Sequence, residues 1–361
     1  MDSSRRKFFK SLTALTSASF LSAGQTLESS KRLQESQAGL HYPDLSGTYL
    51  DNASHHPMTL TAATAVSDYV SGLTRGHSAN VSASVRTKFA QLINAGEDEI
   101  SYGPSTTMGE NLITAALDIP ARGGQIITDA LHFIGSFYLY EQLEKRGMEV
   151  VILPVQEDGS ISIDQYQAAV TDETILIAVS HISWVNGFEH DLKSLSDIAH
   201  AAGAYLYVDL IQSAGNTPID VKAMGIDFAS CGTYKWLMGD FGLAFLYADK
   251  LLLDNLDPPW YGYLQTQNFV TPQTHMYPFD PPGNPPYVSS RREGIEGIFN
   301  GSFPPRMIEA GANISLQMLL ETKIEVLQTQ RQPLIQALQI TLRERGFEPY
   351  TPESSQSPIV S

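Results

Sequence analysis

One lysine in the sequence has unusual neighbours. Lys235 lies between Tyr234 and Trp236 in a turn rich in glycine and aromatic residues. It follows Asp209, the residue that ends the apolar run 205–208. Surface lysines usually lie among other charged residues, whereas this one lies between two predicted buried strands. A lysine amine forms a Schiff base with an aldehyde, so Lys235 is a candidate nucleophile.

A protein that binds pyridoxal phosphate needs more than a lysine. It needs a carboxylate for the pyridine nitrogen, a phosphate site, a ring-stacking partner and a donor for the ring hydroxyl. Asp209 is the candidate carboxylate, and Gln212 could reach the ring hydroxyl. The stretch 103–111 places hydroxyls and free backbone N–H groups at a predicted helix start, which is typical of phosphate sites. His132 or Phe133 could stack on the ring, and we slightly favour His132.

Each candidate also has a simpler interpretation. An aspartate at the end of a strand often caps a helix, and the hydroxyls of 105–107 could form an ordinary N-cap. His181 follows another predicted strand and could be a buried structural histidine. His55 and His56 are adjacent, so their side chains diverge and we expect no metal site there.

The candidates follow strands of a predicted α/β domain. Apolar, β-branched runs that predict strands occur at 125–128, 149–153, 174–179, 205–208 and 243–247. Helical patterns lie between them, which predicts a mostly parallel sheet sandwiched by helices. Ligands of such sheets bind beyond the carboxyl ends of the strands. The residues after these strands are therefore expected to form the site.

Three stretches carry a family resemblance. VSHISWVNGFEHDL, YVDLIQSAGNTPIDV and GTYKWLMGDFG, in this order and spacing, resemble class V aminotransferase-type pyridoxal-phosphate enzymes. This group includes cysteine desulfurases, kynureninases and isopenicillin-N-epimerase-like proteins. The resemblance runs from about Tyr49 to Gln330. It implies the large domain of a fold type I pyridoxal-phosphate enzyme and a homodimer with sites built across two subunits.

The resemblance also implies roles for individual residues. Lys235 becomes the Schiff-base lysine, Asp209 the partner of the pyridine nitrogen and Gln212 the partner of the ring oxygen. The positions implied to contact the phosphate are Thr106, Thr107, Thr233 and Tyr234. The candidates for contact with the substrate are His181, Asn186 and Arg75.

The sequence departs from the family pattern in three places. Its one cysteine, Cys231, is predicted to pack against the sheet, which disfavours the cysteine-dependent route of desulfurases. The stretch 297–300 lacks the threonine that usually reaches the neighbouring subunit's phosphate, and Asn300 or Ser302 are possible substitutes. Residues 357–361 resemble the opening strand of the small C-terminal α+β domain, so this domain is expected to be truncated. The family arginine that binds the substrate carboxylate would lie beyond it, which leaves Arg75 and the pair 291–292 as candidates.

Composition and the ends of the chain suggest the remaining organisation. A net charge of −16 disfavours nucleic acid or an anionic membrane as a partner. Residues 1–24, with the run RRKFFK before a short apolar stretch, resemble a twin-arginine export signal without a stable membrane span. We expect a linker at 25–40, a large domain at 41–300 and a partial small domain at 301–361. The proline-rich region 254–305 is expected to be a long loop, and 306–330 a single amphipathic helix.

These observations predict a pyridoxal-phosphate enzyme that acts on an amino acid or amine. Transamination and Cα or Cβ lyase or epimerase chemistry all begin alike, so the sequence does not select among them. The alternative is a cofactor-binding remnant or partner protein without efficient catalysis. The export signal predicts a periplasmic location, with the cytoplasm as the alternative.

Overall fold

The computed structural model describes residues 49–77, 82–119, 121–270 and 288–361. The predicted signal (1–24) and linker (25–40) therefore lie outside the described residues. None of the helices in the described part of the chain is long and apolar enough to cross a membrane.

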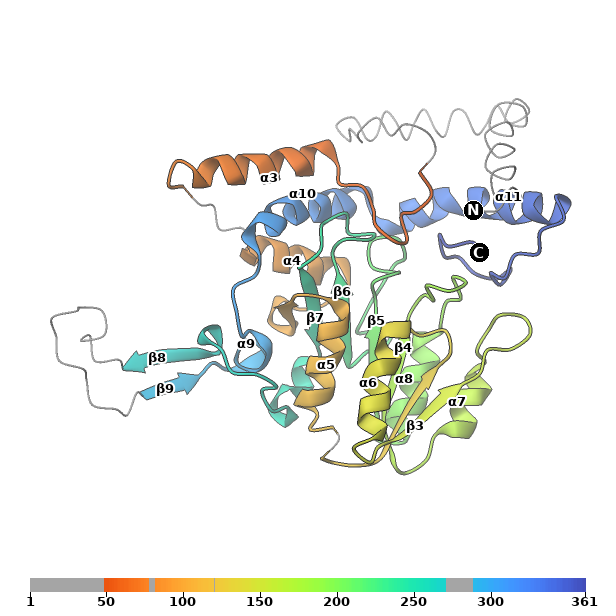
Figure 1. Ribbon diagram of the computed structural model, residues 1–361, viewed down its shortest axis with the longest axis horizontal. Coiled ribbons are helices and arrows are strands. Elements are labelled where there is room, and N and C mark those ends of the chain that lie inside the picture. The colour runs from red at the N-terminus through yellow and green to blue at the C-terminus, as the bar shows by residue number, and fades with distance from the viewer. Residues whose placement is uncertain (1–48, 78–81, 120, 271–287) are drawn as a thin grey trace.

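A seven-stranded sheet forms the centre of the molecule (Figure 1). Its strands in spatial order are β1 (Ile100–Gly103), β7 (Ala244–Ala248), β6 (Phe228–Gly232), β5 (Tyr205–Asp209), β4 (Thr174–Ser180), β2 (Gln125–Asp129) and β3 (Glu149–Leu153). All neighbours are parallel except β7, which runs antiparallel to both β1 and β6. The predicted mostly parallel α/β sheet is confirmed.

Helices cover both faces of this sheet, and each face has its own apolar core. Consecutive residues of β5 show the division, because Val208 belongs to one core and Tyr207 to the other. The helices of the first face are α4 (Ser82–Leu92), α7 (Ile163–Ala169), α8 (Leu192–Ala201) and α10 (Arg306–Thr322). Those of the second face are α5 (Thr106–Ala116), α6 (Ile134–Glu144) and α9 (Gly294–Phe299). Burial on both faces explains why the inner strands are almost continuously apolar.

The antiparallel strand β7 aligns the end of β1 with the end of β6, although these segments are far apart in the sequence. Gly103 at the end of β1 and Gly232 at the end of β6 both pair with Ala244. The turn that carries Lys235 and the start of α5 therefore leave the same edge of the sheet, on either side of β7.

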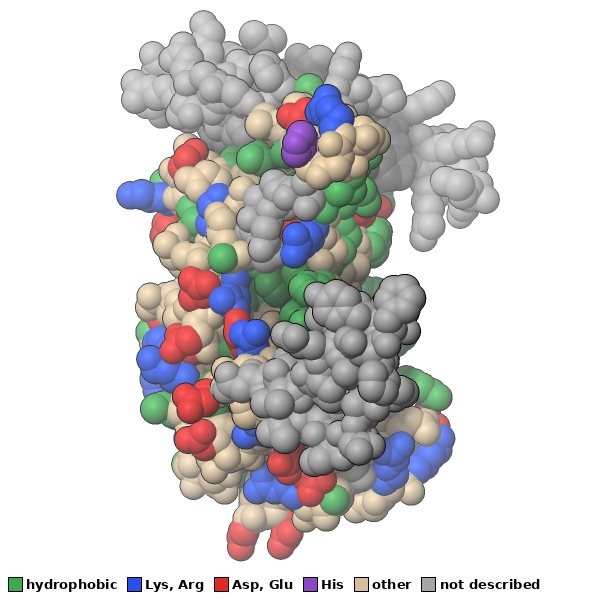
Figure 2. Space-filling model, turned by 90° about the vertical axis from the view of Figure 1, so that its left-hand side faces the viewer, with side chains coloured by type: hydrophobic (Ala, Val, Ile, Leu, Met, Phe, Trp, Pro, Cys, Tyr) green, Lys and Arg blue, Asp and Glu red, His purple; other side chains and the backbone are tan. Residues whose placement is uncertain are grey.

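The proline-rich region 254–305 contains regular structure. Strands β8 (Thr266–Val270) and β9 (Val288–Arg291) pair as a two-stranded ribbon that projects from the body, and α9 follows (Figure 1). The expectation of one long loop was wrong for these residues. The two strands contain no proline, so their backbone N–H groups remain available to the ladder. Figure 2 views this side of the molecule, where hydrophobic side chains lie among acidic and basic ones.

The predicted helix 306–330 is two helices. Helix α10 ends at Thr322 and α11 (Ile324–Glu344) begins after Lys323, whose backbone has φ 66° and ψ 129°. The sequence around the break contains neither glycine nor proline. Helix α10 packs against α3 (Leu60–Leu73) and α4 on the body, and α11 continues beyond its end toward the side opposite the β8–β9 ribbon (Figure 1).

The last residues fold back onto the large domain. The Ser355 hydroxyl donates to the carbonyl of Gly187 at 2.5 Å, and the Tyr350 N–H donates to the carbonyl of Ser361 at 2.7 Å. Residues 357–361 form no strand, in contrast to the expectation. Their polar groups are instead bonded within the segment, for example the Ile359 N–H to the Ser357 hydroxyl at 3.0 Å.

Candidate active site

The predicted site residues meet at the carboxyl ends of the parallel strands. Asp209 ends β5, His132 follows β2, His181 follows β4, and the turn with Lys235 follows β6. The His181 N–H donates to the carbonyl of Asp209 at 3.0 Å, which fixes the ends of β4 and β5 to each other. This is the position at which open α/β sheets bind ligands.

Lys235 is a buried amine whose ammonium lies 5.8 Å from the centroid of the Tyr234 ring. Its side chain is 8% exposed, and no hydrogen bond or ion pair joins its ammonium to any residue that the structure describes. Burial lowers the pKa of Lys235, although the negative charge of Asp209 acts in the opposite direction. The lowered pKa increases the fraction of neutral amine, which is the nucleophilic form.

Asp209 is the acidic counterpart of this lysine. Burial raises the pKa of Asp209 to about 6, and the charges of His132 and Lys235 limit the rise. One carboxylate oxygen, Oδ1, accepts the backbone N–H of Ile211 at 2.8 Å. The other has no hydrogen-bond partner in the described ranges, so it is free to accept a proton or a donor from a ligand.

His132 belongs to a buried polar network. Its Nδ1 lies 2.9 Å from the Ser180 hydroxyl and its Nε2 lies 3.2 Å from a carboxylate oxygen of Glu110. Glu110 also accepts the hydroxyls of Ser136, at 2.5 Å, and Tyr140. Burial favours the neutral imidazole, but the Glu110 carboxylate outweighs it and the pKa of His132 is raised. The ring is therefore fixed in orientation, and Glu110 favours its protonated form.

Glu110 was missed as a site residue. It lies within α5, where a charged residue normally indicates a solvated helix face. Only its packing against the end of β2 and the start of α6 reveals a buried carboxylate.

Phe133 is more exposed than His132. It is the residue before α6, and its ring meets that of Trp184 edge-on at 6.1 Å between centroids. The Trp184 indole donates to the carbonyl of His132 at 3.3 Å. His132, not Phe133, interacts electrostatically with Asp209, which favours His132 as the stacking residue.

The start of α5 is a suitable phosphate site. Helix α5 begins at Thr106, and Ser105 caps it by accepting the N–H of Met108 at 3.1 Å. The Thr106 hydroxyl accepts the N–H of Gly232 at 2.9 Å, which fixes this helix start beside the end of β6. Thr107 is exposed at the first turn, where N–H groups and the helix dipole favour an anion.

The two other predicted phosphate contacts have structural partners. The Thr233 hydroxyl is buried and donates to the carbonyl of Asp240 at 2.7 Å, so it closes the lysine turn. The Tyr234 ring is stacked on Phe241 with centroids 4.1 Å apart. Neither arrangement by itself directs the hydroxyl to the start of α5.

Gln212 connects the lysine turn with the segment 49–57. Its amide oxygen accepts the indole N–H of Trp236 at 2.8 Å, and its amide nitrogen donates to the carbonyl of Ala53 at 3.0 Å. The His56 N–H in turn donates to the carbonyl of Tyr234 at 3.0 Å. The segment 49–57 is thus part of the site, which the sequence did not indicate.

The candidates for contact with the substrate differ in position. Burial lowers the pKa of His181 to about 3, so this histidine is neutral. Asn186 donates to the carbonyl of Gly159 at 2.7 Å and accepts the N–H of Phe188 at 3.0 Å, which ties its amide to a loop. Arg75 is exposed beyond the far end of α3, about 20 Å along the helix from its start. No hydrogen bond joins Asn186 or Arg75 to Lys235 in the part of the chain that the structure describes.

Arg291 and Arg292, the other candidates for binding the substrate carboxylate, lie at the projecting ribbon. Arg291 ends the projecting ribbon, and Arg292 lies just beyond it, where its guanidinium forms an ion pair with Glu296 at 3.2 Å.

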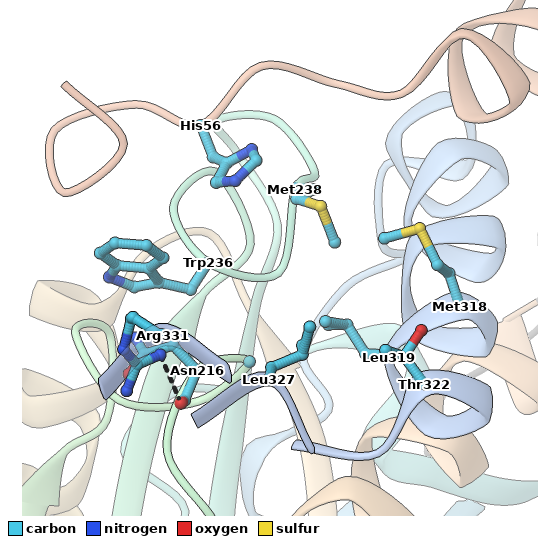
Figure 3. Close-up of a pocket in the computed structure, with 10 residues that line it drawn as sticks. His56, Asn216, Trp236, Met238, Met318, Leu319, Thr322, Leu327 and Arg331 are labelled. Carbon is cyan, nitrogen blue, oxygen red and sulfur yellow. Dashed lines mark hydrogen bonds between the residues drawn. The ribbon is translucent and has the colours of Figure 1, made fainter. Parts of the chain in front are cut away.

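A cavity of about 220 Å³ lies beside the lysine turn (Figure 3). It is lined by His56, Gly215, Asn216, Trp236, Met238, Met318, Leu319, Thr322, Leu327 and Arg331. Gly215 has φ +100°, and a Cβ there would lie 2.4 Å from the carbonyl oxygen of Trp236, so the wall requires glycine. Met238 also has a positive φ, 54°, and its carbonyl accepts the buried Ser315 hydroxyl at 3.1 Å. Arg331, in the middle of α11, is the one arginine in this lining.

The described residues fit pyridoxal phosphate. Lys235 is a buried amine without a hydrogen-bond or ion-pair partner among the described residues, Asp209 has a free carboxylate oxygen, and the start of α5 offers N–H groups for a phosphate. These groups leave one edge of one sheet, and each matches a functional group of the cofactor.

Solved structures with the same fold were found. A cysteine desulfurase CsdA from Escherichia coli aligns with a TM-score of 0.75 and 22% identity, over 89% of this chain and 80% of that chain. A C-DES mutant with glycine covalently linked to its PLP cofactor aligns with a TM-score of 0.73 and 18% identity, over 86% and 82%. At such identities the likeness establishes the fold alone.

Sequence relatives and a family model identify the family. An uncharacterized aminotransferase, YcbU, of Bacillus subtilis is 35% identical over 49% of this chain and 48% of its own length. A probable cysteine desulfurase of Methanothermobacter thermautotrophicus is 31% identical over 59% of this chain and 56% of its own. The chain thus spans about half the length of the curated relatives it matches. The model "Aminotransferase class-V" matches residues 49–280. The chain therefore belongs to the class V aminotransferase family, which confirms the predicted family and its cofactor, pyridoxal phosphate.

Proposed function

We propose that this chain is a pyridoxal-phosphate-dependent enzyme that acts on an amino acid or amine. The observation that carries the proposal is that Lys235, buried and without an ion-pair partner among the described residues, and the buried Asp209 lie at the same edge of the sheet and interact electrostatically. An unpaired buried amine costs stability, and a cofactor site explains why it is retained.

Each residue has a role that follows from its surroundings. Lys235 would hold the aldehyde carbon and afterwards carry the Cα proton, because burial lowers its pKa. Asp209 would hold the proton of the ring nitrogen, His132 would lie on the ring face, and the first turn of α5 would bind the phosphate. When bound, pyridoxal phosphate withdraws the electron pair left on the substrate when a bond at Cα breaks.

The surroundings of Cys231 bear on the reaction type. Cys231, the chain's one cysteine, is fully buried in β6, and burial raises the pKa of its thiol. Such a thiol is a poor nucleophile. Cys231 is therefore not a candidate for the cysteine nucleophile of the desulfurase route.

Reductive trapping tests the cofactor site. The purified chain is incubated with pyridoxal phosphate, reduced with borohydride and digested, and the modified peptide is identified by mass spectrometry. The adduct is expected on Lys235, and Lys235→Ala should abolish it, whereas the exposed Lys250 should be replaceable by alanine without effect. A main adduct on another lysine of the wild type would contradict the proposal.

Product analysis separates the reaction types. Amino acids are offered in deuterated water, and Cα deuterium, keto acid and ammonia are measured. Cα exchange with keto acid indicates transamination, ammonia with a cleaved side chain indicates a lyase, and loss of chirality alone indicates an epimerase. No exchange with any substrate of the panel would favour a chain without catalysis.

We also propose that the protein is an exported homodimer. Tyr261, Tyr263 and Phe303 are exposed aromatic side chains close to the projecting ribbon, which supports an interface there. Analytical ultracentrifugation should give a dimer, and Tyr261→Lys with Tyr263→Lys should give a monomer. Replacing Arg5 and Arg6 by lysine should abolish export, as measured by cell fractionation, if the twin-arginine signal operates.

A further inference from the structure

The cavity beside the lysine turn contains an arginine whose charge is not neutralised. The Arg331 Nη1 donates to the carbonyl of Asn216 at 2.9 Å and Nη2 donates to the carbonyl of Gln356 at 3.0 Å. Its Nε–H is buried and has no hydrogen-bond partner among the described residues. No carboxylate of the described residues lies within 4.0 Å of this guanidinium.

The environment of Arg331 is costly for a cation. Burial lowers the pKa of Arg331 to about 10, and the one carboxylate that opposes this effect is Glu189, which acts from beyond ion-pair distance. Burial also lowers the pKa of His56 on the same cavity, so His56 adds no positive charge near neutral pH. A guanidinium in such a place is stabilised by an anion that makes two parallel hydrogen bonds with it.

Much of the remaining lining is apolar, with Thr322, Asn216 and His56 as its other polar side chains. Met238, Met318, Leu319 and Leu327 form the wall across from Arg331, with the Trp236 indole to one side (Figure 3). A cavity of roughly 150 Å³ lined by aliphatic residues can bind benzene. The volume here, about 220 Å³, is therefore sufficient for a phenyl ring and a carboxylate.

We propose that this cavity is a binding site for a small organic carboxylate with an apolar body. The carboxylate accepts hydrogen bonds from Arg331, and the apolar part packs against the methionine and leucine wall. The site takes an anion without an amino group, so it is distinct from the amine chemistry at Lys235.

The cavity is linked to the cofactor site through Gln212. Asn216, which accepts from Arg331, donates its own side-chain amide to the carbonyl of Gln212 at 2.7 Å. Trp236, which lines the cavity, donates to the side chain of Gln212 at 2.8 Å. Two residues that line the cavity thus hold Gln212, Asn216 through the Gln212 backbone carbonyl and Trp236 through its side chain.

Titration calorimetry with phenylacetate tests the site on the full chain, with and without pyridoxal phosphate. Phenylacetate lacks an amine and cannot react with the cofactor. We expect saturable binding with one site per chain. The neutral phenylacetamide, which lacks the charge, and acetate, which lacks the apolar body, should each bind at least about ten-fold more weakly.

Variants locate the binding. Arg331→Gln should weaken phenylacetate binding by about ten- to a hundred-fold. Arg343→Gln is the matched control, because Arg343 lies on the same helix but pairs with Glu353 at 3.0 Å and does not line the cavity; its binding should equal that of the wild type. Lys235→Ala should also bind normally, which keeps this test independent of the proposed function.

Three results would overturn the proposal: no saturable binding of phenylacetate to the wild type, equal binding of the amide, or unchanged binding by Arg331→Gln. If Arg331→Gln fails to fold, the comparison of acid, amide and acetate on the wild type still decides the question.

Discussion

The pKa of Asp209 predicts that this residue destabilises the cofactor-free protein. Burial raises the pKa of Asp209 from 3.8 to about 6. A group whose pKa is higher in the folded state makes its full contribution to stability below its unfolded pKa. This contribution is lost as the pH rises through the folded pKa. A shift of roughly two units at about 1.4 kcal/mol per unit corresponds to about 3 kcal/mol at pH 8.

Asp209→Asn should therefore stabilise the cofactor-free protein near neutral pH. Asparagine keeps the shape of the side chain and an oxygen that can accept the Ile211 N–H, but it carries no charge. The expected gain in the free energy of unfolding is up to about 3 kcal/mol at pH 8, and it should be about 1 kcal/mol smaller at pH 5.5.

Urea denaturation followed by circular dichroism at both pH values measures this difference. Asp220→Asn is the matched control, because hydrogen bonds from Ala223, Asn94 and Lys222 outweigh partial burial and lower the pKa of Asp220; this variant should not be stabilised. A variant at position 209 that is less stable than the wild type at pH 8, or whose gain is the same at pH 5.5, would refute the reasoning.

Three further perturbations follow from the structure. Glu110→Gln should destabilise the fold, most strongly between about pH 4.5 and 6.5. In this window Glu110 is above its unfolded pKa and His132 is below its unfolded pKa, so the pair of opposite charges is fully formed. Urea midpoints at pH 6 and pH 9 should show a smaller loss of stability at pH 9. Gly215→Ala should lower stability by more than about 1 kcal/mol and weaken pyridoxal-phosphate binding, because its Cβ would displace the carbonyl of Trp236 in the lysine turn; unchanged calorimetric affinity would contradict this. Lys323→Gly should raise the melting temperature by about 2–4 °C, because glycine relieves the backbone strain of the positive φ, 66°, between α10 and α11. Lys323→Ala should leave the melting temperature unchanged.

The sequence predicted the sheet well because its signal is local. The inner strands β2, β4 and β5 are buried on both faces, so they appear as short apolar runs, and the residues after these runs converge at one edge, whereas β6, with the sequence FASCG, was not predicted. Asp209, His132 and Lys235 could be located in this way. The antiparallel pairing of β7 could not, since strand direction depends on contacts between segments far apart in the chain.

Residues whose role depends on tertiary packing carry no signal in the sequence. Glu110 and Arg331 lie in the middle of helices, where a charged residue usually faces water, and only the packing shows that both are partly or fully enclosed. The break at Lys323 was missed for a similar reason, because the positive φ occurs at a lysine and neither glycine nor proline marks it. Asn186 was selected from the family resemblance, but its amide is used to hold the Gly159 loop.

The pairing of both Gly103 and Gly232 with Ala244 has a consequence for biosynthesis. Within the sheet, strands β1 and β6 are joined through β7, which is made after both of them. A nascent chain that ends before Ala244 already contains helix α5 and the lysine turn, and the Thr106 hydroxyl and the Gly232 N–H can link them directly, but it lacks the strand that pairs with both β1 and β6. This edge of the sheet is therefore complete only after β7 has left the ribosome and entered the sheet.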